Sequence, residues 1–187
     1  MGELSIALEY LEESTRARKL VGDRQGLAVC LNNLSRIQNH RGELQAALEA
    51  TEEALATFQD VGDRKGIAIT RCNLGELLLL LGRPLDARKM LEECERIDRE
   101  NEGAPLACNI LCNLARVELV ACDDPAAEKL FQECLSRLPA EQDQELRAHA
   151  LAGLAEIFLN RGLEEAAEDA LREAEELSTK GAGQENR

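Results

Sequence analysis

Hydrophobic and polar residues alternate along this chain with helical spacing, and the whole pattern returns every 40 residues. The alignment of the repeats needs no gap. One column holds only leucine and another only alanine: Leu34, Leu74, Leu114 and Leu154, and Ala47, Ala87, Ala127 and Ala167. A repeat of this length is one supersecondary unit, which buries its apolar face only by stacking on its neighbours. The pattern therefore predicts a stacked repeat protein, in which function belongs to a surface rather than to a catalytic cleft.

Each repeat contains two blocks of helical periodicity, separated by turn residues. In Gly22-Asp23 and Gly62-Asp63, the glycine can end one helix in the left-handed conformation and the aspartate can cap the next. We predict an all-α fold of helical hairpins, in a single domain that ends near residue 180. Its elements are a lone helix at 3–20 and four hairpins at about 24–60, 64–100, 105–138 and 143–179, followed by a disordered tail at 181–187.

The lone first helix matches the second helix of a repeat, because Ala7 falls in the column of Ala47. Since the ends of a repeat stack need a polar outer face, a half repeat indicates a segment of a longer array. The alternative is that this helix is itself the cap. Without a partner helix, the surface near Leu4, Ile6, Ala7 and Leu11 should be partly uncovered, and we expect a weak homodimer through it.

Charge and composition narrow the classes of partner and of cellular location that the sequence allows. The formal net charge of −14 repels phosphate backbones, and one tyrosine, three phenylalanines and no tryptophan offer little to stack on bases. We therefore expect a protein or peptide partner and no nucleic acid. The seven cysteines are odd in number and form no CxxC pair, which favours a reducing, cytoplasmic compartment. The longest apolar run, 77–81, is far shorter than the roughly 20 residues of a membrane span, so we expect no membrane insertion.

The sequence offers little for catalysis or for metal binding. Its two histidines, His40 and His149, lie in different repeats, and no phosphate-binding loop, HExxH or EF-hand pattern is present. Cys108 and Cys112 are one helical turn apart and His149 is one repeat further on, so these three could form a zinc site. However, Cys108 shares a column with Ala28, where cysteine serves as a compact apolar residue. We expect a non-enzymatic protein with no catalytic residue, cofactor or metal.

The columns resemble the tetratricopeptide repeat, which has a Leu-Gly pair in the first helix, a glycine at the hairpin turn and small residues in the second helix. In one repeat these are Leu74-Gly75, Gly82, and Ala87 with Cys94. The 40-residue period is similar to the subclass of G-protein-signalling modulators, kinesin light chain and the sensor arrays of bacterial NTPase regulators. The resemblance implies a right-handed α-solenoid, and it assigns function only by class.

The resemblance also implies that the first helices of successive repeats line a concave surface. On it, Asn33, Asn73 and Asn113 form a column, and because asparagine is mildly unfavourable inside a helix, three in register need a reason. Each amide could hold the main chain of a peptide, or it could bond a neighbouring repeat and only set the spacing; both alternatives stay open. An apolar floor lies beside this column. The candidate peptide-binding residues are Asn33, Arg36, Ile69, Asn73, Leu79, Leu80, Asn109, Asn113, Arg116 and Leu119.

The sequence is compatible with two functions. The favoured one is a protein–protein interaction scaffold that binds a peptide or a helix of a partner in its concave groove. The alternative is an effector-sensing array of a larger signal-transduction NTPase or transcriptional regulator. A nucleotide-binding motif in an adjoining segment would favour the sensor, whereas a protein partner that binds the groove would favour the scaffold.

Overall fold

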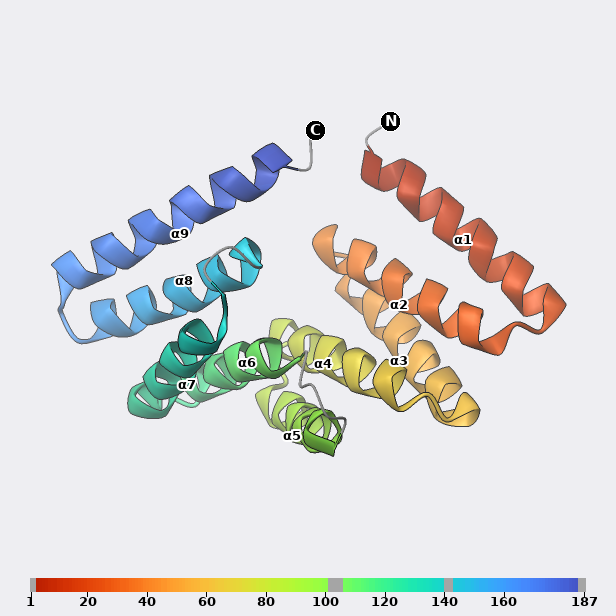
Figure 1. Ribbon diagram of the computed structural model, residues 1–187, viewed down its shortest axis with the longest axis horizontal. Coiled ribbons are helices and arrows are strands. Elements are labelled where there is room, and N and C mark those ends of the chain that lie inside the picture. Colours follow the sequence, from red (N-terminus) through yellow and green to blue (C-terminus); the bar gives the residue numbers. More distant parts are fainter. Residues whose placement is uncertain (1–2, 101–105, 140–142, 185–187) are drawn as a thin grey trace. The chain divides into compact units, whose positions relative to one another are not determined.

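The computed structural model describes residues 3–100, 106–139 and 143–184, and every regular element in these ranges is an α-helix (Figure 1). This confirms the all-α prediction. The nine helices of these ranges are α1 (Glu3–Val21), α2 (Arg24–His40), α3 (Leu44–Val61), α4 (Arg64–Leu80), α5 (Pro84–Glu100), α6 (Ala107–Val120), α7 (Asp124–Arg137), α8 (Gln144–Asn160) and α9 (Glu164–Gln184).

The chain divides into two compact units, Met1–Ala104 and Pro105–Arg187. In the first unit, α2 with α3 and α4 with α5 form helical hairpins, and α1 packs on α2 as α3 packs on α4. In the second unit, α6 with α7 and α8 with α9 form hairpins, and both α6 and α7 pack on α8. A single solenoid that includes both units stays a prediction.

Helix ends follow the turn residues of the repeat. Gly22 and Gly62 have φ values of 75° and 72°, a left-handed conformation that glycine adopts without steric cost. The next residues, Asp23 and Asp63, each accept a hydrogen bond from the third backbone N–H that follows, at 2.9 Å. Each cap satisfies a donor that the helix leaves free, so the sequence ends one helix and starts the next within two residues. The predicted helix ends and caps are confirmed here.

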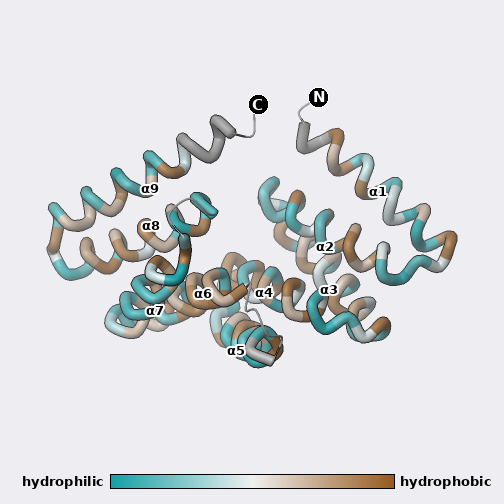
Figure 2. The backbone as a smooth tube through the Cα atoms, viewed as in Figure 1, coloured by the Kyte–Doolittle hydropathy of each residue, from teal (hydrophilic) through white to brown (hydrophobic). Residues whose placement is uncertain are grey.

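Small residues occupy the crossings between helices. Ala47, Ala87, Ala127 and Ala167 are all fully buried, as the alanine column predicts. A side chain of one methyl group lets two helices approach closely, and larger apolar side chains then pack on either side. Figure 2 shows hydrophobic and hydrophilic residues alternating along each helix, as expected for helices that bury one face. No helix in the described ranges is both long enough and apolar enough to cross a membrane.

The last helix is longer than the sequence indicates. The structure continues α9 to Gln184, so the prediction of a disordered tail at 181–187 is wrong for residues 181–184. Residues 185–187 lie outside the described residues. The segment Gly181-Ala182-Gly183 suggests fraying because glycine is a poor helix former, but it directly follows a helix whose earlier turns are packed, and those turns provide the nucleus.

Candidate functional site

A stripe along α2 stays uncovered in the first unit. Val29, Asn33 and Arg36 are spaced by four and three residues, so they lie on one side of the helix, and all three are exposed. The same positions in α4 are Ile69, Asn73 and Glu76, which are half-buried. We call these residues of α2 and α4, together with Leu80, the unit-1 stripe. It combines apolar side chains with amides and charges.

The asparagines of the unit-1 stripe have different environments. Asn73 donates from Nδ2 to Oδ1 of Asn32 in the preceding repeat, at 3.0 Å. The hydroxyl of Thr70 donates to the same Oδ1 at 3.4 Å. Asn33 is exposed, and its side chain has no hydrogen-bond partner in the described part of the chain. Asn73 therefore joins two repeats, whereas the amide of Asn33 is left without a hydrogen bond to any described residue.

The second unit uses the same column differently. Asn113 is buried, with 7% of its surface exposed, and its Oδ1 accepts from the guanidinium of Arg116 at 3.3 Å. In the next repeat the column holds Gly153, and a Cβ there would lie 2.2 Å from the ring of Phe131. The fully buried Phe131 thus fills the space that an asparagine would need. The column is a packing position in this unit, and whether Asn113 contacts a ligand stays a prediction.

The apolar floor is only partly open. Leu80 has 44% of its surface exposed, whereas Leu79 and Ile69 are half-buried. In the second unit, Leu119 packs against the core around Phe131, and Asn109 is half-buried. Of the candidate apolar contacts, Leu80 is therefore the one that offers the most surface.

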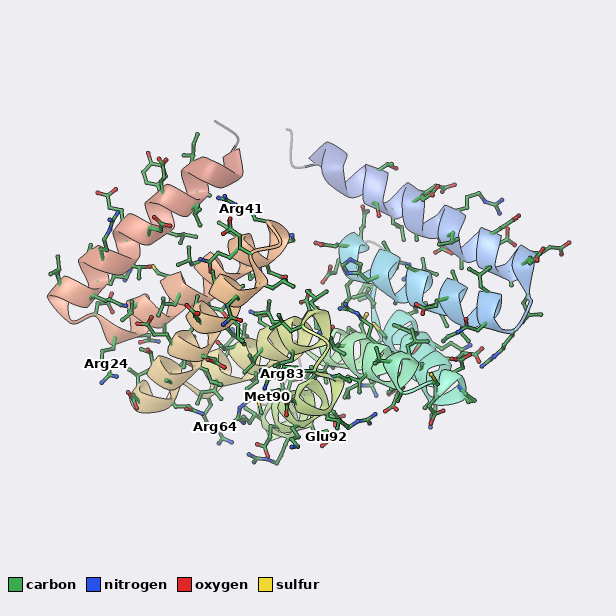
Figure 3. All side chains as sticks on the ribbon, turned by 180° about the vertical axis from the view of Figure 1, so that it is seen from behind. Arg24, Arg41, Arg64, Arg83, Met90 and Glu92 are labelled. Carbon is green, nitrogen blue, oxygen red and sulfur yellow. The ribbon has the colours of Figure 1, made fainter. Side chains whose placement is uncertain are left out.

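The exposed guanidinium of Arg36 has no ion-pair partner among the residues that the structure describes. Several other cations of the first unit are paired: Arg41 with Glu43 at 2.9 Å, Arg83 with Asp86 at 2.8 Å, and Arg24 with Asp60. Arg24 and Arg41 lie at the two ends of α2 (Figure 3), and Arg83 lies in the turn between α4 and α5. Arg36, about one turn before the end of α2, is thus an unpaired cation in a chain with a net charge of −14.

Apart from the exposed Cys122, the cysteines are buried or half-buried in the core. Cys94 and Cys134 are fully buried, and their thiols donate to the carbonyls of Ala68 at 3.0 Å and Cys108 at 3.3 Å. A hydrogen bond with Cys112 and burial raise the pKa of Cys134, and burial raises the pKa of Cys108. Such thiols are poor nucleophiles. Within the described ranges, no three His, Cys, Asp or Glu side chains are placed to hold a metal ion, and the absence of a bound metal stays a prediction.

The sequence pattern of the tetratricopeptide repeat matches residues 39–100. Sequence comparison with curated proteins gives no match.

Solved structures share the fold over nearly the whole chain. A variant of a putative kinesin light chain from Podosopora anserina, with nearly identical TPR-like repeats, is 17% identical with a TM-score of 0.67, over 97% of this chain and 89% of that chain. BtubC (BKLC) from P. vanneervenii is 15% identical with a TM-score of 0.65, over 98% of this chain and 94% of that chain. MamA is 15% identical with a TM-score of 0.55, over 90% and 96%. At these identities the likeness is one of fold.

Sequence reasoning missed the residues that join successive repeats. Asn32 and Thr70 do not share a repeat column, so the alignment does not bring them together. Phe131 and Gly153 do leave a signal. Phe131 is a large aromatic residue in its repeat column. In the next repeat, Gly153 stands where the column of Asn33, Asn73 and Asn113 would have an asparagine.

Proposed function

Because the chain is built from tetratricopeptide repeats, we propose that it is a non-enzymatic scaffold that binds a peptide or a helix of a partner protein along α2 and α4. The observation that carries this proposal is the set of unused groups on one side of α2. Asn33 and Arg36 are exposed without a partner in the described residues, and Val29 is exposed beside them. Buried or paired groups could not offer these contacts.

The chemistry of the unit-1 stripe indicates the kind of ligand. The amide of Asn33 can both donate to and accept from a peptide main chain, and Arg36 can donate to a carbonyl or a carboxylate. Leu80 and Val29 favour an apolar side chain on the ligand. A net charge of −14 disfavours strongly acidic partners, so the ligand is an apolar segment with few acidic groups. In unit 2, Asn113 is buried and Asn109, Arg116 and Leu119 are half-buried, so they offer a ligand less surface than Asn33 and Arg36 do.

A cytoplasmic location belongs to the same proposal. All seven cysteines are free thiols, including the exposed Cys122. Free thiols of this number are typical of a reducing compartment, where glutathione and thioredoxin keep them reduced.

A random peptide library, selected on the immobilised chain, tests the proposal. Peptides that the unchanged chain selects are labelled and titrated against the double variant Asn33→Ala with Arg36→Ala. We expect binding to weaken about tenfold, since each lost hydrogen bond contributes about 0.5–1.5 kcal/mol. Both side chains are exposed, so circular dichroism should not change.

The control is Glu52→Ala on the exposed side of α3, which should leave binding intact. Equal binding to the double variant would move the ligand site off α2. A library that yields no peptide would remove the peptide-binding proposal itself.

A further inference from the structure

The outer side of α1 carries an uncovered apolar stripe. Tyr10, Glu13, Ala17 and Leu20 are spaced by three or four residues, so they lie on one side of the helix. Tyr10 has 69% of its surface exposed and Leu20 has 88%, and Glu13 and Ala17 are also exposed. Together with Ile6, these residues form what we call the α1 face. Tyr10 is the only tyrosine of the chain.

The other second helices show what normally covers this face. The positions of Tyr10 and Ala17 in α3 are Ala50 and Thr57, both of which are buried. The position of Glu13 corresponds to Glu93 in α5. It also corresponds to Glu173 in α9, and both of these carboxylates pair with an arginine on the first helix of their own hairpin. At the same position, Glu53 of α3 pairs with Lys19 of α1, and Glu133 of α7 pairs with Arg137 of its own helix. In α5 and α9 this side therefore contacts the hairpin partner, and no described helix covers it on α1.

The charges of α1 are complementary to a second α1 that runs in the opposite direction. Glu9 and Glu13 precede Arg16 along the helix, and Lys19, further on, pairs with Glu53 of α3. Glu13 and Arg16 have no ion-pair partner within the described ranges. In an antiparallel pair, Glu13 of each helix faces Arg16 of the other, and a twofold axis forms this ion pair twice. In a parallel pair, like charges would face each other.

We propose that the α1 face is a self-association site, on which the α1 of a second copy of this chain packs antiparallel. Tyr10 of each copy then lies against Leu20 of the other, and Glu13 of each lies beside Arg16 of the other. The second copy takes the place that a hairpin partner takes on α3. This inference does not depend on the proposed peptide binding.

The single tyrosine makes the site directly observable. With one tyrosine and no tryptophan in the chain, intrinsic fluorescence reports on Tyr10 alone. We expect sedimentation velocity to show a monomer–dimer equilibrium, and acrylamide to quench Tyr10 less as the protein concentration rises. A strict monomer, in which Tyr10 is quenched equally at every concentration, would overturn the proposal. So would a monomer in which Tyr10 is always shielded, because another segment of the same chain would then cover the face.

Substitutions distinguish dimerisation through the α1 face from non-specific hydrophobic association. Tyr10→Glu should weaken dimerisation about tenfold, as expected for an aromatic residue at the centre of an interface. The matched control is Leu85→Glu, since Leu85 has 74% of its surface exposed on α5 and lies outside the α1 face. An equal loss in both variants would overturn the assignment to α1.

A charge exchange tests the antiparallel arrangement. Glu13→Arg alone and Arg16→Glu alone should each abolish the dimer, because each places like charges together twice. An equimolar mixture of the two variants restores both pairs, so it should dimerise at least as well as the unchanged chain. Both residues are exposed, so helix content should stay the same. If each single variant dimerised normally, the antiparallel pairing would be wrong.

Discussion

Cys122 lies at a hairpin turn where the other repeats have glycine, and its backbone conformation there is sterically unfavourable for a residue with a Cβ. Its φ is 59°, and Gly42, Gly82 and Gly162 at the equivalent positions have φ values of 75°, 70° and 71°. A side chain with a Cβ is disfavoured in this left-handed conformation by about 1–2 kcal/mol. We therefore predict that Cys122→Gly stabilises the protein.

The size of the gain follows from two opposing effects. Glycine relieves the steric cost, but it also gives the unfolded chain more freedom, which costs about 0.4–1 kcal/mol. The net gain should be about 0.5–1 kcal/mol, or a rise of about 1–4 °C in melting temperature for a chain of this length. Packing should contribute little, because Cys122 is exposed and nothing lies within 4 Å of a Cβ built at the equivalent glycines.

Thermal and urea unfolding, followed by circular dichroism in the presence of a reductant, measure this gain. Cys122→Ala is the matched control, because it removes the thiol and keeps the Cβ, and its melting temperature should barely change. The reverse change, Gly82→Ala, should destabilise by a similar amount. If Cys122→Ala stabilised as much as Cys122→Gly, the thiol rather than the backbone conformation would be the cause, and the reasoning would be refuted.

Three further substitutions address packing, the asparagine column and a helix cap. Gly66→Ala should destabilise by about 1–3 kcal/mol in urea unfolding, because its Cβ would lie 2.4 Å from the ring of the buried Phe58. Asn113→Ala should destabilise by about 0.5–1.5 kcal/mol, whereas Asn33→Ala should not; equal melting temperatures would contradict the different environments. A backbone N–H at the start of α2 holds the pKa of Asp23 below its ordinary 3.8, so this carboxylate stabilises the fold above that pH. Asp23→Asn should therefore lower the melting temperature at pH 7, and the difference should disappear as the pH falls through the folded pKa.

The helices and their ends could be predicted because local residues determine them. Gly62 can end α3 because glycine adopts a positive φ without steric cost. Asp63 can cap α4 because its side chain accepts from the backbone N–H three residues later. The alanine column follows from the close approach of two helices within one hairpin. Gln184 shows the limit of such reasoning: glycines near residue 181 suggest an end, but the packed turns before them extend the helix.

The candidate site could be predicted only in part, because its side chains depend on the neighbouring repeat. The sequence places Asn73 and Asn113 in one column, but it does not show that Asn73 bonds Asn32 or that Asn113 is buried. These outcomes depend on which side chains the adjacent helices bring nearby. A repeat column therefore identifies a position in the fold, and the neighbours decide whether that position binds a ligand.

The free amide of Asn33 and the exposed ring of Tyr10 have the same structural origin. The amide of Asn73 is hydrogen-bonded because α2, the first helix of the preceding repeat, supplies Asn32. For Asn33, the equivalent partner would come from a first helix paired with α1, and that same helix would cover Tyr10. A second copy packed on the α1 face would stand in this place, beside α2, and would limit access to Asn33. Self-association and peptide binding should then oppose each other. Because such coupling is reciprocal, a bound peptide should shift the chain toward monomer, and Tyr10→Glu should strengthen peptide binding at concentrations where the unchanged chain dimerises.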